Sequence, residues 1–133
     1  MKVRTDFICE LNQKKLWLRR EDLIKEEVKG NKFRKLKYNL IEAKKVGSSA
    51  ILTFGGAFSN HLYATALSGY LNGIKTYGIV RGNEWEEKIK DSPTLVNCVN
   101  YGMGLIFVSR ETFKKKNDCE FWSIIKLNPS KFY

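Results

Sequence analysis

Three short apolar segments recur between residues 49 and 109, and helical sequence separates them. The segments read "SAILTF" (49–54), "KTYGIVRG" (75–82) and "GLIFVS" (104–109). Residues 60–72 and 93–101 lie between them and have helical character, with glycine directly after the first of these stretches. Strands alternating with helices at intervals of roughly 25 residues are typical of βαβ units. The spacing therefore predicts an α/β fold with an open parallel sheet and right-handed crossovers.

Further elements are expected on either side of this core. "KLWLRRED" (15–22) predicts an early strand, and "KFRKLKYNLIEAKKVG" (32–47) predicts a helix that Asn31 could cap. Its apolar positions follow helical spacing: Phe33, Leu36, Leu40 and Ala43. A last helix is expected over residues 110–127.

The sequence closes on a turn signal, "NPS", followed by "KFY". Phe132 and Tyr133 resemble the opening of another strand, at the point where the sequence stops. A sheet that ends inside an element leaves an unpaired edge, which natural proteins usually cover. We therefore expect the chain to be a truncated part of a larger protein.

The stretch "GGAFSNH" (55–61) lies between the first of the three strands and the helix that follows it. In parallel sheets, ligands bind beyond the carboxyl ends of the strands. Ser59 and Asn60 fall at the helix start, where free N–H groups and the helix dipole favour an anion. The alternative is a simple N-cap after a glycine turn. His61, the only histidine, could act as a base, as a ligand or in a local hydrogen bond.

A lysine precedes the core at a helix start of its own. Lys32 follows Gly30 and Asn31, so the helix dipole disfavours its charged form and makes it a candidate nucleophile. Lys35 lies one turn later on about the same face. The alternative is a pair of ordinary surface lysines.

The composition argues against several classes of protein and of binding site. No apolar run approaches the roughly 20 residues of a membrane span, and the first residues lack a secretion signal, so we expect a cytoplasmic protein. The three cysteines form no CxxC pair, and no metal site is expected. The net charge of +10 favours anionic ligands and keeps a basic nucleic-acid-binding module as an alternative. The basic residues are dispersed, however, and no nucleic-acid-binding motif occurs.

Two segments together carry a family resemblance: "LWLRREDLIKEEVKGNKFRKLKYNL" and "LTFGGAFSNHLYATA". The chain resembles the pyridoxal-phosphate enzymes of the 1-aminocyclopropane-1-carboxylate deaminase and D-cysteine desulfhydrase family, which have the tryptophan-synthase-β-like fold, or fold type II. The resemblance continues through "GIKTYGIVRGNE", "SPTLVNCVNYGMGLIFVSRE" and "FKKKND" and so covers essentially the whole chain.

The resemblance implies roles for the residues already singled out. Lys32 would hold pyridoxal 5′-phosphate covalently and move a substrate proton, and Asn60 would hydrogen-bond the phenolic oxygen of the cofactor. Ser59, Asn60 and His61 would grip the substrate carboxylate, and Ser59 would assist proton transfer. Lys35 would lie near the cofactor phosphate.

Family members are about twice as long or longer, and their later half supplies a glycine-rich phosphate loop and substrate-facing tyrosines. The resemblance therefore implies that the chain corresponds to the N-terminal portion of such an enzyme. Residues 1–47 would form an arm and the lysine-bearing helix, and residues 48–133 an incomplete small α/β domain. The implied function is a lyase or deaminase for a small amino acid, homodimeric at full length. We expect the chain alone to bind cofactor weakly and to turn over poorly or not at all. A non-catalytic half that needs a partner chain remains a further alternative.

Overall fold

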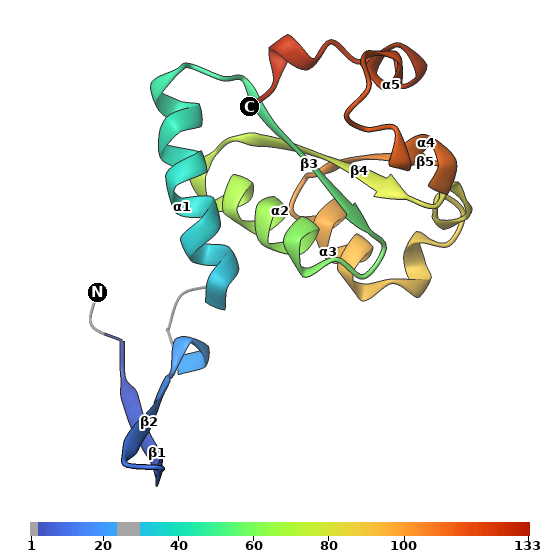
Figure 1. Ribbon diagram of the computed structural model, residues 1–133. Helices are drawn as coiled ribbons and strands as arrows, with labels where there is room; N and C mark the ends of the chain where they lie inside the picture. The colour runs from blue at the N-terminus through green and yellow to red at the C-terminus, as the bar shows by residue number, and fades with distance from the viewer. Residues whose placement is uncertain (1–2, 24–29) are drawn as a thin grey trace.

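The computed structural model describes residues 3–23 and 30–133 (Figure 1). Residues 30, 31 and 33 are described by their backbone alone. The expected cap at Asn31 and the expected burial of Phe33 therefore lie outside the described side chains.

Three parallel strands form the centre of the fold. They are β3 (Ala50–Gly56), β4 (Lys75–Arg81) and β5 (Gly104–Val108), hydrogen-bonded in that order. Helices α2 (Asn60–Asn72) and α3 (Pro93–Asn100) make the two crossovers, which confirms the predicted α/β fold with a parallel sheet. The register places Gly56 beside Arg81 and Arg81 beside Val108. The carboxyl ends of all three strands therefore meet at one edge.

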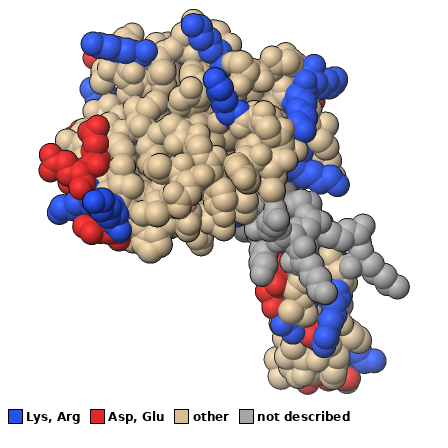
Figure 2. Space-filling view, turned by 180° about the vertical axis from the view of Figure 1, so that it is seen from behind, with Lys and Arg blue, Asp and Glu red and all other residues tan. Residues whose placement is uncertain are grey.

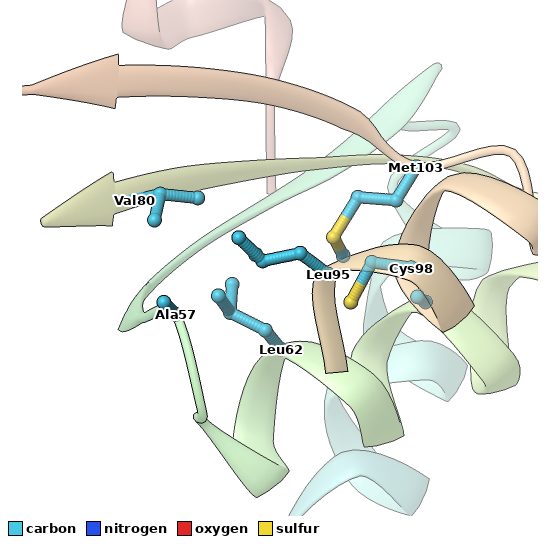
Figure 3. Close-up of a cluster of buried hydrophobic side chains, with 7 residues drawn as sticks. Ala57, Leu62, Val80, Leu95, Cys98 and Met103 are labelled. Atoms are coloured by element: carbon cyan, nitrogen blue, oxygen red, sulfur yellow. The ribbon is translucent and has the colours of Figure 1, made fainter. Parts of the chain in front are cut away.

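Helices α2 and α3 cover one face of this sheet, and their apolar side chains meet those of the strands (Figure 3). Leu62 of α2 and Leu95 of α3 are fully buried against Val80 of β4. Gly78 lets α2 come this close, because a Cβ there would lie 2.9 Å from Leu62 Cδ2. The first turn of α2 is thus fixed by packing on the strands.

The opposite face of the sheet has its own core. Ile79, next to Val80 in β4, points to that face because side chains alternate along a strand. It packs with Val108 and with Phe121 of α5 (Cys119–Ile124). The sheet is therefore buried on both faces, as parallel sheets generally are.

The prediction of one continuous helix over residues 110–127 is wrong. The structure has two short helices there, α4 (Arg110–Lys114) and α5, separated by a turn at residues 115–118. Asp118 N donates to Lys115 O at 2.8 Å, and Asp118 takes the N-cap position of α5. Asn117 and Asp118 favour turns and caps over helix interiors, which explains the break.

The last residues pair with the outer edge of β3. Tyr133 N donates to Ala50 O and Leu52 N donates to Tyr133 O, both at 3.0 Å, and Phe132 forms a parallel bridge with Ala50. The expected strand opening at residues 132–133 is confirmed as this short parallel pairing.

Two elements precede the sheet. Helix α1 (Gly30–Lys45) packs through Leu36 on Ala64 and Leu67 of α2. Strands β1 (Thr5–Leu11) and β2 (Lys14–Arg19) form an antiparallel hairpin that stands away from the sheet (Figure 1). No helix within the described ranges is long and apolar enough to cross a membrane.

Replacing Leu62 by alanine tests the role of the α2 contact. Leu62 is fully buried, so Leu62→Ala should lower the free energy of unfolding by about 2–5 kcal/mol. Leu71, on the same helix but 48% exposed, is the matched control, and Leu71→Ala should cost less than about 1 kcal/mol. Urea denaturation of both variants measures the difference. Equal losses would contradict the assigned core.

Candidate functional site

Three of the residues singled out by sequence stand at the carboxyl edge of the sheet. Strand β3 ends at Gly56, and α2 begins at Asn60 after a three-residue loop. Ser59 precedes the helix, Asn60 opens it, and His61 follows. All three therefore stand at the edge where α/β sheets receive ligands.

Ser59 is the N-cap of α2. Its Oγ accepts hydrogen bonds from the N–H groups of His61, at 3.2 Å, and Leu62, at 3.3 Å. The capping alternative is therefore realised in the structure. The two bonds use the oxygen of the hydroxyl and leave its proton available to an acceptor.

Gly55 allows the helix start to sit directly over the end of β3. A Cβ at Gly55 would lie 2.6 Å from Leu62 Cγ and 2.7 Å from Ser59 Oγ, closer than real contacts allow. At Gly56, by contrast, a Cβ would meet nothing within 4 Å. The two adjacent glycines therefore differ: the first is required by packing, and the second borders open space.

His61 links the start of α2 to the lysines of α1. Its pKa lies below the usual value of 6.5, first because the ring is partly buried and then because of the positive charges of Lys32 and Lys35. The imidazole is therefore mainly neutral at pH 7. Lys32 is half-buried and Lys35 is exposed. The structure thus brings both lysines within electrostatic reach of His61.

Two cavities flank the first turn of α2. The smaller, of about 210 Å³, lies between α1, α2 and β3, and its lining includes His61, Thr65, Leu36 and Asn39. The larger, of about 360 Å³, lies at the carboxyl edge of the sheet. It is lined by Gly56, Ala57, Phe58, Ser59, Arg81, Trp85 and Arg110.

Ser59 and His61 therefore face different cavities, although they are only two residues apart. Among the described residues, the linings of these two cavities include neither Lys32 nor Asn60. Lys32 is thus related to the site through the effect of its positive charge on the pKa of His61. Asn60, the first residue of α2, is exposed.

Sequence reasoning missed the arginines of the larger cavity. Arg81 is the last residue of β4, and Arg110 comes two residues after the end of β5. Arg81 lies near the end of one predicted strand segment and Arg110 directly after another, which was a usable signal because the carboxyl ends of parallel strands share one edge.

A buried serine links the loop between β3 and α2 to the next helix, α3. Ser92 Oγ donates to Ala57 O at 2.6 Å and accepts from Leu95 N at 3.2 Å, as the N-cap of α3. Ser92 is fully buried, so both bonds are shielded from water.

Within the described ranges, no three side chains of His, Cys, Asp or Glu gather closely enough to hold a metal ion. The donors at this edge are amine, amide, hydroxyl, imidazole and guanidinium groups, which suit an organic anion.

The two glycines can be tested as a matched pair. Gly55→Ala should lower the free energy of unfolding by roughly 1–3 kcal/mol, because its Cβ overlaps Leu62 and Ser59. Gly56→Ala should stay within about 0.5 kcal/mol of the parent protein. Thermal unfolding followed by circular dichroism measures both. A neutral Gly55→Ala would mean that the helix start is looser than described.

The link between Lys32 and His61 can be measured by titration. Lys32→Gln should raise the pKa of His61 toward 6.5, because it removes a positive charge that disfavours the imidazolium. Lys44→Gln, at the other end of α1, should leave it unchanged. As the only histidine, His61 gives an unambiguous proton NMR signal. An unchanged pKa in Lys32→Gln would place the amine elsewhere.

The same lowered pKa has a consequence for stability. The unfolded chain binds the proton more readily than the folded chain, so the free energy of unfolding should fall as the pH drops from 6.5 toward the folded value. In Lys32→Gln this fall should be smaller.

No protein-family profile matches the sequence. A Thermotoga maritima protein, whose name provisionally assigns it as a 1-aminocyclopropane-1-carboxylate deaminase, is 33% identical over 112 residues, which are 82% of this chain and 35% of that protein. The Arabidopsis thaliana mitochondrial bifunctional D-cysteine desulfhydrase/1-aminocyclopropane-1-carboxylate deaminase is 44% identical over 62 residues, which are 46% of this chain and 16% of that protein.

A crystal structure described as an ACC deaminase homologue matches with a TM-score of 0.69 at 21% identity, over 93% of this chain and 38% of the other. The chain thus spans about a third of the length of the Thermotoga protein and of this solved chain. The structural match establishes the fold, and the sequence matches support the family resemblance over the portion that is covered. The resemblance to the 1-aminocyclopropane-1-carboxylate deaminase and D-cysteine desulfhydrase family is therefore confirmed over a portion of those proteins.

Proposed function

We propose that this chain is a portion of a pyridoxal-phosphate-dependent lyase or deaminase that acts on a small amino acid. The observation that carries the proposal is that the positive charges of Lys32 and Lys35 act on His61, next to the capped start of α2. An amine and an anion-binding helix start are what such a reaction requires of the protein. The names of the relatives support D-cysteine and 1-aminocyclopropane-1-carboxylate as leading substrate types.

The described residues include those that we propose to hold pyridoxal 5′-phosphate. When bound, pyridoxal 5′-phosphate supplies an electron sink that makes loss of a proton from carbon feasible. The half-buried Lys32 is the residue proposed to hold it covalently. Asn60 would donate to its phenolic oxygen, and Lys35 would lie near its phosphate.

The remaining steps belong to the protein's own groups. Backbone amides of the first turn of α2 and the side chains of Ser59 and Asn60 would orient the substrate carboxylate. The neutral imidazole of His61 adds no positive charge beside Lys32, so the amine of Lys32 can take up a proton at lower electrostatic cost. Lys32 Nζ is the atom proposed to move the proton at the α or adjacent carbon, and the Ser59 hydroxyl would assist.

Catalysis by this chain alone is expected to be poor, because the family resemblance places the phosphate loop and the substrate-facing tyrosines in a later portion. A homodimer at full length, and a non-catalytic half that pairs with a separate chain, both remain proposals. A cytoplasmic location likewise remains an expectation.

A basic nucleic-acid-binding module is less well supported. On the face shown in Figure 2, the Lys and Arg side chains are scattered, with acidic groups beside several of them and uncharged surface between. Recognition of a phosphate backbone favours a continuous basic stripe. The net charge of +10 is the remaining argument for that alternative.

Chemical trapping tests the proposal with this chain as it is. The protein is incubated with pyridoxal 5′-phosphate, reduced with borohydride and mapped by peptide mass spectrometry. We expect the label to concentrate on Lys32 and to be lost in Lys32→Ala. Lys37→Ala, an exposed lysine on the same helix, is the control and should label like the parent. Label spread evenly over exposed lysines, such as Lys114 and Lys115, would contradict the assignment.

A further inference from the structure

We infer that the outer surface of α2 and α3 is a contact surface for a second copy of this chain and pairs the two copies through tyrosine side chains. The surface consists of Tyr63, Tyr70 and Leu71 of α2 and of Tyr101, which follows α3. We name it the tyrosine face. Because the inference concerns assembly, it depends neither on a cofactor nor on the proposed reaction.

Two long segments of the sequence carry no charged side chain. Residues 46–74 and 92–109 contain no Asp, Glu, Lys or Arg, although these four residue types make up 29% of the chain. Burial between two layers explains the missing charge in the strands of these segments. It does not explain the missing charge at Tyr70 and Leu71, which are 63% and 48% exposed. Depletion of charge together with enrichment of tyrosine is typical of the centre of a protein–protein interface.

The three tyrosine rings form one continuous group. The centroid of the Tyr101 ring lies 5.9 Å from that of Tyr63 and 5.6 Å from that of Tyr70. A hydrogen bond with the side chain of Tyr101, and then partial burial, raise the pKa of Tyr63 above its usual value of 10.0. The Tyr63 hydroxyl is therefore protonated and uncharged at neutral pH. The tyrosine face thus offers aromatic surface and hydroxyl groups to a partner.

Two of the rings are held in place by the contact between α1 and α2. Tyr63 and Tyr101 pack against the buried cluster of Leu36, Ala64 and Leu67. Side chains that are already fixed in the free chain lose little conformational entropy when a partner binds. The tyrosine face is therefore organised for contact before a second copy arrives.

Charge selects a second copy as the partner. Each copy carries a net charge of +10, so two copies repel and meet at the lowest cost where no charged side chains are brought together. The tyrosine face meets that condition. A polyanion such as nucleic acid would instead gain most from the Lys and Arg side chains elsewhere. A tyrosine hydroxyl both donates and accepts, so identical tyrosines can hydrogen-bond one another across a two-fold axis.

The size of the tyrosine face sets the expected strength of the contact. An aromatic side chain presents about 150–250 Å², so the exposed parts of the four side chains amount to roughly 300 Å². An apolar patch of about 300–600 Å² on a monomer is often functional. A standard interface buries about 800 Å² per partner, so this one is small. We therefore expect a reversible dimer with a Kd of roughly 10–100 µM.

Sedimentation equilibrium of this chain, without cofactor, tests the inference. The chain is measured from about 10 µM to about 500 µM, a range that brackets the expected Kd. A reducing agent is present, because Cys9 and Cys119 are exposed. The dimer should form at about 0.5 M salt, and its Kd should be several-fold higher at about 0.05 M salt, because salt screens the repulsion between two positively charged copies. Nitrogen-15 NMR spectra over the same concentrations should show shifts centred on the tyrosine face.

Two matched substitutions make the test specific. Leu71→Glu places a charge on the tyrosine face and should raise the Kd at least about tenfold. Leu11→Glu makes the same change at the end of β1, where Leu11 is 70% exposed, and should change the Kd less than about twofold. Both variants alter the net charge equally, and both side chains are exposed, so neither substitution should unfold the chain.

Three outcomes would overturn the inference. These are a monomer over the whole concentration range at high salt, association that is stronger at low salt, and equal effects of Leu71→Glu and Leu11→Glu. A larger effect of Leu11→Glu would assign the contact to the hairpin of β1 and β2 instead. Labelling of Lys32 is measured separately, so failure of the proposed function and failure of this inference are distinguishable.

Discussion

The burial of Leu62 against β3 and β4 determines where the start of α2 lies at the edge of the sheet. Leu62 is the third residue of α2, so fixing it fixes the helix start at the carboxyl edge of the sheet. Full burial of such a side chain contributes about 1.5–3 kcal/mol, more than the roughly 1 kcal/mol of a typical N-cap. Gly55 and Gly78 leave the space that this contact requires. Packing therefore places the helix start, and the Ser59 cap completes it.

Much of this fold follows from hydrophobic periodicity. The three sheet strands and α2 form where the pattern predicts them, because short apolar runs bounded by turns leave few alternatives. The single helix expected over residues 110–127 runs through Asn117 and Asp118, whose side chains favour turns, and the structure breaks there. Strand β1 was missed because Asn12 and Gln13, both at positive φ, make its hairpin turn without the glycine that usually marks one.

The site was less accessible to sequence reasoning than the fold. The residue types in the stretch 55–61 indicated an anion-binding helix start. The position of this stretch after β3 placed it at the carboxyl edge of the sheet, where the structure has it. That Ser59 and His61 open into separate cavities depends on what packs on each side of α2. The approach of α1 depends on Leu36 meeting Ala64 and Leu67, a contact between distant segments. Arg81 and Arg110 line one cavity because the register of β4 and β5 brings the carboxyl ends of these strands side by side.

The buried hydroxyl of Ser92 has a mechanical consequence. It binds the carbonyl of Ala57 and caps α3 at once, so the loop after β3 cannot shift without breaking a bond that water cannot replace. The loop and the first turn of α3 must therefore move as one rigid piece. A ligand arriving at this edge meets a preorganised surface and loses little of its binding energy to ordering the backbone.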